Sequence, residues 1–348
     1  MSENINIDKP KVKKRIDYID TLKFLAIFAV IFLHAYKVNP HIMIMHHNFY
    51  KLRAFTDFGI PVFLMVTGAL ALNKDIDLEI FIKKKFTRII LPLVFYFLIS
   101  YAMGIDKDFL VSFWYSWMII GAYLAIPLVN KIIKYSSMKE IEYFVAMIVI
   151  TSIFYCCSHF FDFKYALDLN FFITPLSYIV IGYFLFKKDF TKYLSPNKLI
   201  LVLSVIFVII SIIKMKVGLL NCIYPSAHLF VGIDMGIVAL IQGCCVFLIV
   251  KYVYDEHRDK FTLVKNFLQN KIIKKFIFSI SRSTYGIFFV HVLVFRGLLY
   301  PIVRGMGFKG VTLFLIVIAS GIIGLLLSWI ITYILGHIPY IKYLSGYY

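Results

Sequence analysis

Ten apolar runs, separated by short polar segments, follow one another along almost the whole chain. They lie near residues 22–38, 56–72, 89–104, 109–130, 141–160, 169–186, 199–213, 227–250, 276–299 and 311–335. A helix needs about 20 apolar residues to cross the hydrocarbon core of a bilayer. Flanking lysine and arginine side chains can reach the membrane surface from a shorter run. The runs therefore predict an all-α, polytopic membrane bundle of about ten transmembrane helices.

The composition agrees with a chain that lies in lipid. Hydrophobic residues make up 61% of the 348 positions and charged residues only 16%, against roughly half and a quarter in soluble domains. The net charge of +18 raises the possibility of a nucleic-acid partner. Such proteins, however, gather their basic residues on one polar surface, whereas here the basic residues fall in short groups between apolar runs. We therefore expect no nucleic-acid partner.

The distribution of lysine and arginine predicts the orientation of the runs. Basic residues gather in alternate connecting segments, starting with KPKVKKR at residues 9–15, and this excess is typical of cytoplasmic segments. An even number of crossings then places both termini in the cytoplasm. We expect a basic cytosolic tail at 1–19, a membrane domain at 20–336 and a short cytosolic tail at 337–348.

Neither the cysteines nor a histidine-rich segment predicts a metal site. The five cysteines show no CxxC or zinc-type spacing. The segment HIMIMHHNF at residues 41–49 contains residue types that bind copper, but nothing in the sequence sets their geometry. We therefore expect no metal.

Ionisable residues within the first apolar run are the strongest functional signal. Residues 17–36 read DYIDTLKFLAIFAVIFLHAY and include Asp20, Lys23 and His34. The eleven-residue spacing of Lys23 and His34 leaves them about 20° from a whole number of turns and about 16 Å apart along a helix, so they share one face. Asp20 is three residues from Lys23 and can pair with it. Charges inside a membrane mark function; the alternative is a lysine that reaches the surface and a histidine that bonds a neighbouring helix.

Two further segments carry polar residues at the start of an apolar run. The first, FIKKKFTRIILP at residues 81–92, holds three lysines and Arg88; it is either a phosphate-binding entrance or only a topology signal. The second, ISRSTYGIFFVHVLV at residues 280–294, has a polar cluster followed by His291. His291 either lines the same cavity as His34 or is a packing histidine, and the cluster either contributes to a site or only caps a helix.

The longest polar stretch, Tyr252–Lys275, alternates apolar and basic residues. This pattern predicts an amphipathic helix on the cytoplasmic surface of the membrane. A binding segment for a calmodulin-like partner is the alternative interpretation.

Five of these segments, taken in order, resemble the acyltransferase-3 family of bacterial membrane acyltransferases. The resemblance runs from Tyr18 to about Tyr333. It is carried by DTLKFLA at 20–26 with His34, FGIPVFLMVTG at 58–68, KFTR at 85–88 with Pro92, WMIIGAYLAIP at 117–127 and STYGIFFVH at 283–291. The segment ISRS at 280–283 and the lack of a fused hydrolase-like domain most resemble the enterobacterial common antigen O-acetyltransferase type.

Four positions depart from the usual family pattern. Lys23 and Lys85 stand where arginine is commoner, Thr67 where serine is usual, and Phe288 where tyrosine is frequent. Because lysine binds phosphate as a point charge and arginine as a two-pronged donor, the two lysines would make single-point contacts.

The resemblance implies a membrane-bound O-acyltransferase of the bacterial inner (plasma) membrane. Its donor would be cytosolic acyl-CoA, most simply acetyl-CoA, and its acceptor a hydroxyl of a cell-surface or lipid-linked glycan. The implied catalytic residues are His34, Lys23 and Asp20. The implied donor-binding residues are Lys85, Arg88 and Lys84. The implied residues of the substrate cavity are His291, Tyr285, Trp117 and Tyr123.

In this interpretation, neutral His34 acts as a general base or as a nucleophile. The other partner is the lipid bilayer, and the sequence makes no prediction of the oligomeric state. A transporter or flippase for a lipid-linked glycan is the alternative function. Many transporters have inverted repeats, and no repeat is evident in this sequence.

Overall fold

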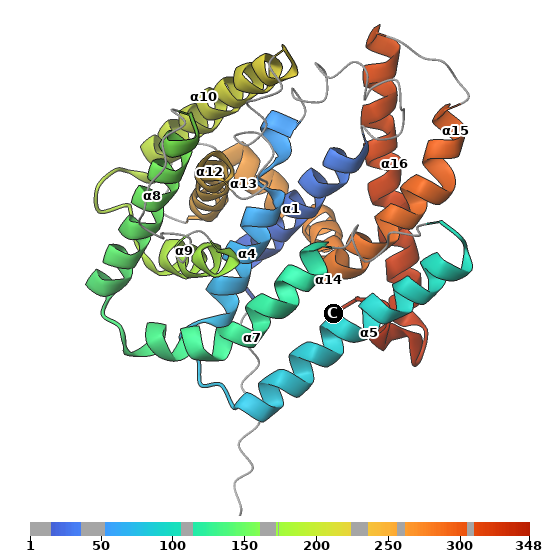
Figure 1. The fold of residues 1–348 in the computed structure, drawn as a ribbon, viewed down its shortest axis with the longest axis horizontal. Helices are drawn as coiled ribbons and strands as arrows, with labels where there is room; N and C mark the ends of the chain where they lie inside the picture. The colour runs from blue at the N-terminus through green and yellow to red at the C-terminus, as the bar shows by residue number, and fades with distance from the viewer. Residues whose placement is uncertain are drawn as a thin grey trace, which may run out of the picture.

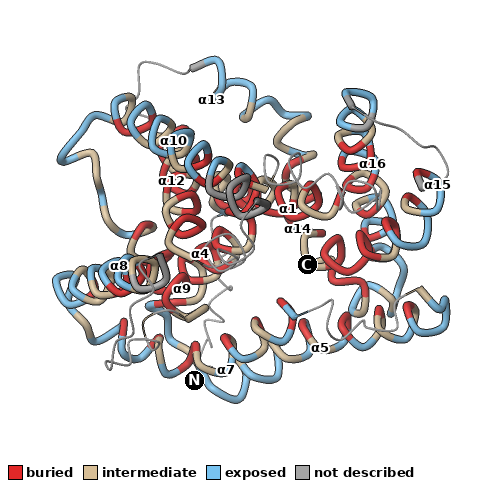
Figure 2. Tube along the Cα trace, turned by 45° about the horizontal axis from the view of Figure 1, so that its top comes forward, coloured by how far each residue is buried: buried red, intermediate tan, exposed pale blue. Residues whose placement is uncertain are grey.

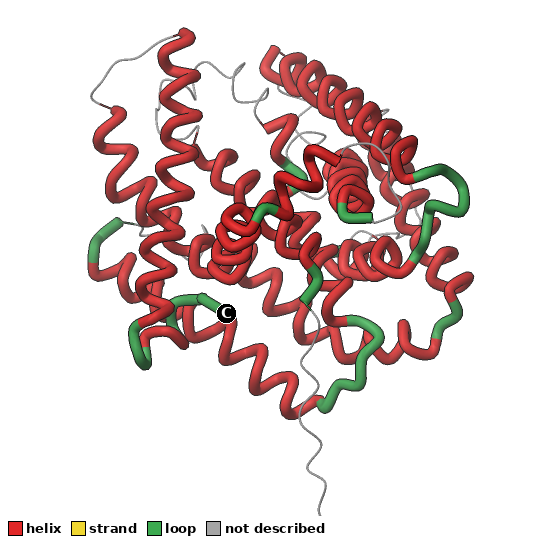
Figure 3. The backbone as a smooth tube through the Cα atoms, turned by 180° about the vertical axis from the view of Figure 1, so that it is seen from behind, coloured by secondary structure: helices red, strands yellow, loops and turns green. Residues whose placement is uncertain are grey.

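The computed structural model describes residues 15–35, 53–105, 114–160, 172, 174–223, 236–255, 262–304 and 310–348. Within these ranges every regular element is a helix and no strand occurs (Figure 3). The all-α class predicted from the sequence is confirmed.

Ten apolar helices overlap the ten predicted runs in the described part of the chain (Figure 1). They are α1 (Asp17–Ala35), α4 (Gly59–Ala71), α5 (Leu78–Ala102), α7 (Trp114–Tyr135), α8 (Met138–Phe160), α9 (Pro175–Lys187), α10 (Pro196–Ile223), α12 (Ile237–Val253), α14 (Lys271–Val294) and α16 (Gly310–His337). The shorter elements are α13 (Thr262–Gln269), the π-helix η4 (Phe295–Leu299), α15 (Tyr300–Arg304) and the 3-10 helix η5 (Ile341–Tyr343).

The lengths of these helices fit a polytopic membrane protein. Eight candidate spans are long and apolar enough to cross a bilayer, whereas α9 and α12 are shorter. Figure 2 shows exposed residues along the outer sides of α5 and α10 and buried residues on α4, α12 and α14. Leu201, Val205 and Ile209 on α10 are among the exposed apolar residues, as is typical of a surface that contacts lipid. The polytopic bundle is confirmed, and the count of ten crossings stays a prediction.

Several helices begin earlier than their apolar runs, and α5 and α14 show the reason. α5 starts at Leu78, where the Asp77 side chain accepts a hydrogen bond from the Ile80 amide at 2.9 Å. α14 starts at Lys271 and is capped in the same way by Asn270. Charged residues mark the limit of an apolar run but not of a helix, since lysine is a good helix former and the caps satisfy the first amides. The basic residues within 83–88, and Arg282, therefore lie inside α5 and α14.

The predicted amphipathic segment contains α13, which ends one residue before Asn270. Leu263 and Phe267 on α13 are exposed. An exposed apolar face on a short amphipathic helix is typical of a helix that lies on a membrane surface.

The centre of the bundle is held by close helix crossings. A Cβ on Gly68 of α4 would overlap the carbonyl oxygen of Ile179 on α9, and a Cβ on Gly182 would overlap that of Met65. Small residues allow two membrane helices to approach backbone to backbone. Gly59 makes a similar but looser crossing with α1 at Ala26.

Helices α1, α5 and α14 begin at one end of the bundle, which we call the basic end. An ion pair joins Lys274 to Asp17 there at 2.5 Å, and the Tyr348 hydroxyl donates to the Arg88 carbonyl at 2.8 Å. Arg15, the first described residue, lies over the ring of Phe278. Both ends of the described chain are thus at the same end of the bundle, which supports an even number of crossings.

Residues 338–348, which we call the C-terminal segment, fold back on the helices (Figure 1). Gly346 has a φ of 74°, a left-handed conformation that glycine adopts without strain. Ser345 and Gly346 are buried. The segment predicted as a short tail is therefore packed against the bundle.

Candidate active site

Two histidines from opposite ends of the chain meet inside the bundle. His34 lies in the last turn of α1, and His291 is on α14. Their rings are 4.8 Å apart between centroids, in an edge-to-face arrangement. The His291 side chain is only 1% exposed. The two rings are in contact, so His291 lies in the same surroundings as His34.

The local hydrogen bonds of both rings select the same tautomer. Nδ1 of His34 lies 2.9 Å from the Val30 carbonyl oxygen, and Nδ1 of His291 lies 3.2 Å from that of Ile287. Because a carbonyl oxygen only accepts, each Nδ1 donates. A neutral ring that donates from Nδ1 keeps its lone pair on Nε2. Each histidine can therefore present Nε2 as a base or nucleophile.

The wall beside the histidines is aromatic. Phe288 and Phe295 have ring centroids 5.8 Å and 6.2 Å from that of His291. The Tyr300 hydroxyl donates to the His34 carbonyl oxygen at 3.2 Å. Phe295 opens the π-helix η4, and one-turn π segments within helices are frequent at functional sites. These rings give the histidine pair largely apolar surroundings.

Asp20 is held by residues other than its expected partner. Its carboxylate receives hydrogen bonds of 2.5 Å from the Arg15 Nε and from the Ser281 hydroxyl. Among the ion pairs of the described residues, its partner is Arg15 and not Lys23. The carboxylate turns toward α14 because a guanidinium and a hydroxyl both donate to it there. Asp20 also interacts electrostatically with Lys23, the residue with which the sequence predicts that it can pair, but the ion-pair contact itself is with Arg15.

Lys23 and Lys85 are close enough to interact electrostatically. Lys23 interacts electrostatically with Lys85 as well as with Asp20. The Lys85 ammonium lies 5.0 Å from the ring centroid of Tyr123 on α7. Two cations brought together in a bundle suit a ligand with several negative charges.

Arg88 lies beside Tyr348 of the C-terminal segment. Its guanidinium carbon lies 5.0 Å from the ring centroid of Tyr348. A pocket of about 370 Å³, which we call the basic pocket, is lined by Ile80, Lys83, Lys84, Thr87, Arg88, Tyr343 and Tyr348. Lys84 and Arg88, one turn apart on α5, thus share this pocket, whereas Lys85 is not among its lining residues.

The other predicted cavity residues separate into two groups. The Tyr285 hydroxyl donates to the Ile89 carbonyl at 3.0 Å, and Tyr285 interacts electrostatically with Tyr115, Tyr123 and Tyr348. Tyr115 in turn has its ring centroid 5.1 Å from that of Phe288. A row of aromatic residues therefore connects the basic pocket to the histidine pair. Trp117 is different, since 49% of it is exposed on the outer side of α7.

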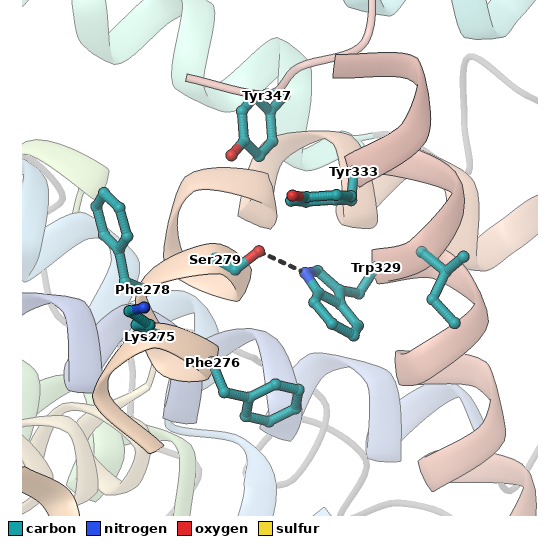
Figure 4. Close-up of a pocket in the computed structure, with 8 residues that line it drawn as sticks. Lys275, Phe276, Phe278, Ser279, Trp329, Tyr333 and Tyr347 are labelled. Atoms are coloured by element: carbon teal, nitrogen blue, oxygen red, sulfur yellow. Dashed lines mark hydrogen bonds between the residues drawn. The ribbon is translucent and has the colours of Figure 1, made fainter. Parts of the chain in front are cut away.

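A second pocket, of about 530 Å³, lies between α14 and α16 at the basic end (Figure 4). Its aromatic walls are Phe276, Phe278, Trp329, Tyr333 and Tyr347. The Trp329 indole donates to the Ser279 hydroxyl at 3.0 Å (Figure 4). Sequence reasoning missed this pocket, although Trp329 and Tyr333 are one turn apart on α16.

Sequence reasoning also missed a buried ion pair between Lys214 of α10 and Asp57, two residues before α4. The two side chains are 3% and 1% exposed, and Arg53 also bonds Asp57 at 3.2 Å. Gln242 of α12 donates to the Ser211 hydroxyl beside them at 2.7 Å. The sequence contained a signal for this ion pair, because both charged residues fall within or directly after apolar runs.

No group of three metal-ligating side chains occurs within the described ranges. The histidine-rich segment considered for copper lies outside the described residues.

A family model described as an acyltransferase domain, that of acyltransferase-3, matches residues 16–333. The match extends from the start of α1 to near the end of α16 and leaves out the C-terminal segment. Comparisons with curated proteins and with solved structures found no significant match.

Proposed function

Because the chain belongs to the acyltransferase-3 family and is a membrane acyltransferase, we propose that it transfers an acetyl group from acetyl-CoA to a hydroxyl of a cell-surface or lipid-linked glycan. The observation that supports this proposal most is the contact of His34 with His291 at 4.8 Å. A row of aromatic residues and two groups of cations lead from the basic end to this pair. The membrane would be the inner membrane of a bacterium.

The donor enters from the basic end in this proposal. Lys84 and Arg88 bind phosphate groups of coenzyme A, and Lys85 and Lys23 hold further negative charge along the path. The pantetheine arm then extends along α1 toward His34, over the roughly 16 Å that separates Lys23 from His34. Asp20 is a positioning residue, because its bonds to Arg15 and Ser281 join the start of α1 to α14.

Nε2 of His34 accepts the proton of the acceptor hydroxyl while the hydroxyl oxygen bonds the thioester carbonyl carbon. The carbon–sulfur bond then breaks, and the imidazolium returns the proton to the departing thiolate. Transfer through an acetyl-histidine uses the same nitrogen, with acetyl moving from sulfur to Nε2 and then to the hydroxyl. The contacting ring of His291 orients His34.

The acceptor in this proposal is a polysaccharide. The likeness of residues 280–283 to the enterobacterial common antigen type favours a lipid-linked or surface polysaccharide. Comparing glycan mass spectra of a deletion strain and its parent identifies both the group and the acceptor, because the deletion strain lacks one acyl unit.

Acetyl transfer is tested with radiolabelled acetyl-CoA supplied to membranes that contain the protein and its glycans. We expect label in the glycan, and we expect His34→Ala to lower kcat by about 10²- to 10⁴-fold, since it removes the base. Wild-type rates in His34→Ala would refute the role of this residue. Movement of glycan that needs no acyl-CoA would instead favour a transporter.

A further inference from the structure

The C-terminal segment is tied to the bundle by hydrogen bonds on both sides. The Tyr348 amide donates to the Arg282 carbonyl at 2.9 Å, and the Arg282 Nε donates to the Tyr348 carbonyl at 3.1 Å. The buried Tyr96 hydroxyl of α5 donates to the Ser345 carbonyl at 3.0 Å. The segment is therefore built into the surface between α5 and α14.

α14 has a matching recess for this segment. A Cβ on Gly286 would overlap the Ser345 carbonyl oxygen, so only glycine allows the segment to approach this closely. Gly286 is one residue after Tyr285, which lies on the aromatic row to the histidines. The position of the segment is thus fixed relative to the proposed donor path.

Consecutive tyrosines of the segment face different pockets. Tyr347 lines the aromatic pocket between α14 and α16, and Tyr348 lines the basic pocket with Tyr343. The Tyr348 ring lies against the Arg88 guanidinium, and its hydroxyl bonds the Arg88 backbone. Burial raises the pKa of the Tyr348 hydroxyl to about 12, so it adds no negative charge to the pocket at neutral pH.

The lining of the basic pocket identifies a class of ligand. Lys83, Lys84 and Arg88 supply positive charge, and none of the lining residues is acidic. Lysine and arginine bind phosphates, and exposed aromatic rings stack on nucleobases. A lipid phosphate would satisfy the cations but leave the tyrosine rings without a role. A purine nucleotide with several phosphates uses both.

We propose that the C-terminal segment completes the donor site, with the basic pocket binding the adenosine 3′,5′-bisphosphate end of coenzyme A. Tyr348 and Tyr343 contact the adenine, and Lys83, Lys84 and Arg88 bind the phosphates. The proposal rests on the proposed function for the identity of the donor. It goes beyond the family relationship, since the family match ends at residue 333 and the segment follows it.

The first test measures equilibrium binding of adenosine 3′,5′-bisphosphate to the full-length protein in lipid nanodiscs. We expect Tyr348→Leu to weaken binding about tenfold or more, since it removes the stacking ring, and Tyr348→Phe to retain it. Tyr347→Leu is the matched control, because the neighbouring ring faces the other pocket, and we expect wild-type affinity. Equal losses in both leucine variants would refute a direct contact of Tyr348 with the nucleotide.

Inorganic phosphate and vesicles with anionic lipid distinguish the alternatives in the same assay. Competition by either one that matches competition by unlabelled adenosine 3′,5′-bisphosphate would show a general anion site and overturn the proposal. Binding needs no turnover, so it can be measured even in a protein that transfers nothing. A protein that binds the bisphosphate but acetylates no glycan would contradict the proposed function alone.

The second test compares two donors. Acetyl-phosphopantetheine carries the same thioester as acetyl-CoA but lacks the adenosine 3′,5′-bisphosphate group. We expect Tyr348→Leu and Arg88→Gln to raise KM for acetyl-CoA about tenfold with little change for acetyl-phosphopantetheine. Lys131→Gln, an exposed lysine of α7, serves as the charge control. An equal rise in KM for both donors would show that the pocket does not bind the nucleotide, whatever the overall activity.

Discussion

The histidine pair depends on details of single residues. Both rings donate from Nδ1 to the carbonyl four residues earlier, which leaves Nε2 of each for chemistry. Of the two, His34 is less buried and is aligned with Lys23 along α1. We therefore assign proton transfer to His34 and orientation to His291.

This assignment predicts strong coupling between the two histidines. Residues that act as a unit have non-additive effects, so His34→Ala/His291→Ala should be slower than His34→Ala by no more than about threefold. The measurement is single-turnover acetyl transfer. His337→Ala is the control, because His337 makes the same local bond to Tyr333 but is exposed on α16. Two independent losses that multiply would contradict the assignment.

At the scale of helices, backbone contact at glycine decides how the core is built. α4 and α9 cross at Gly68 and Gly182, where no Cβ fits. Asp57, two residues before α4, forms the buried ion pair with Lys214 of α10. Such a pair is costly to break, because one partner then stays buried without the other's charge. α4 is thus fixed on two sides, and α1 packs against it at Gly59.

A pair of glycine variants tests the crossing. Gly68→Ala should destabilise the protein by about 3 kcal/mol or more, because α4 and α9 must move apart. Gly121→Ala on α7 is the matched control: a Cβ there meets nothing within 4 Å, and alanine favours a helix over glycine by about 1 kcal/mol. The two variants are compared by heating them in detergent and measuring the fraction of protein that stays monodisperse at each temperature. Equal stability of the two variants would mean that α4 and α9 do not touch at Gly68.

At the scale of the whole molecule, basic residues and both ends of the described chain lie at the same end of the bundle. The basic end gathers the beginnings of α1, α5 and α14 with the C-terminal segment, and the histidine pair lies farther along α1 and α14. If this end faces the cytoplasm, the basic residues that orient the protein also attract an anionic donor.

Topology is tested with fusions to residue 348. A green fluorescent protein at this position should fluoresce and an alkaline phosphatase should be inactive, because both ends of the described chain lie at the basic end. A phosphatase fused after residue 105 should be active, because this residue lies in a predicted external segment between the third and fourth apolar runs. The opposite pattern at either position would reverse the proposed orientation of the donor site.

The sequence by itself determined the helices, their apolar character and the family. Lys23 and His34 share a helix face because the spacing within one helix follows from its period. The family motifs are also short segments of sequence, so each could be recognised without knowing which helices surround it. The basic residues of α5 and α14 could be identified for the same reason. The apolar runs, however, begin later in the sequence than the helices themselves.

Only the tertiary structure decided which residues meet. That His34 touches His291, that Asp20 bonds Ser281 rather than Lys23, and that Tyr348 closes the basic pocket all depend on how helices rotate and cross. Those rotations are set by packing between distant segments, such as the backbone contacts at Gly68 and Gly286, and a local pattern carries no record of them. The sequence identifies the reactive groups, and the packing of the bundle brings them together.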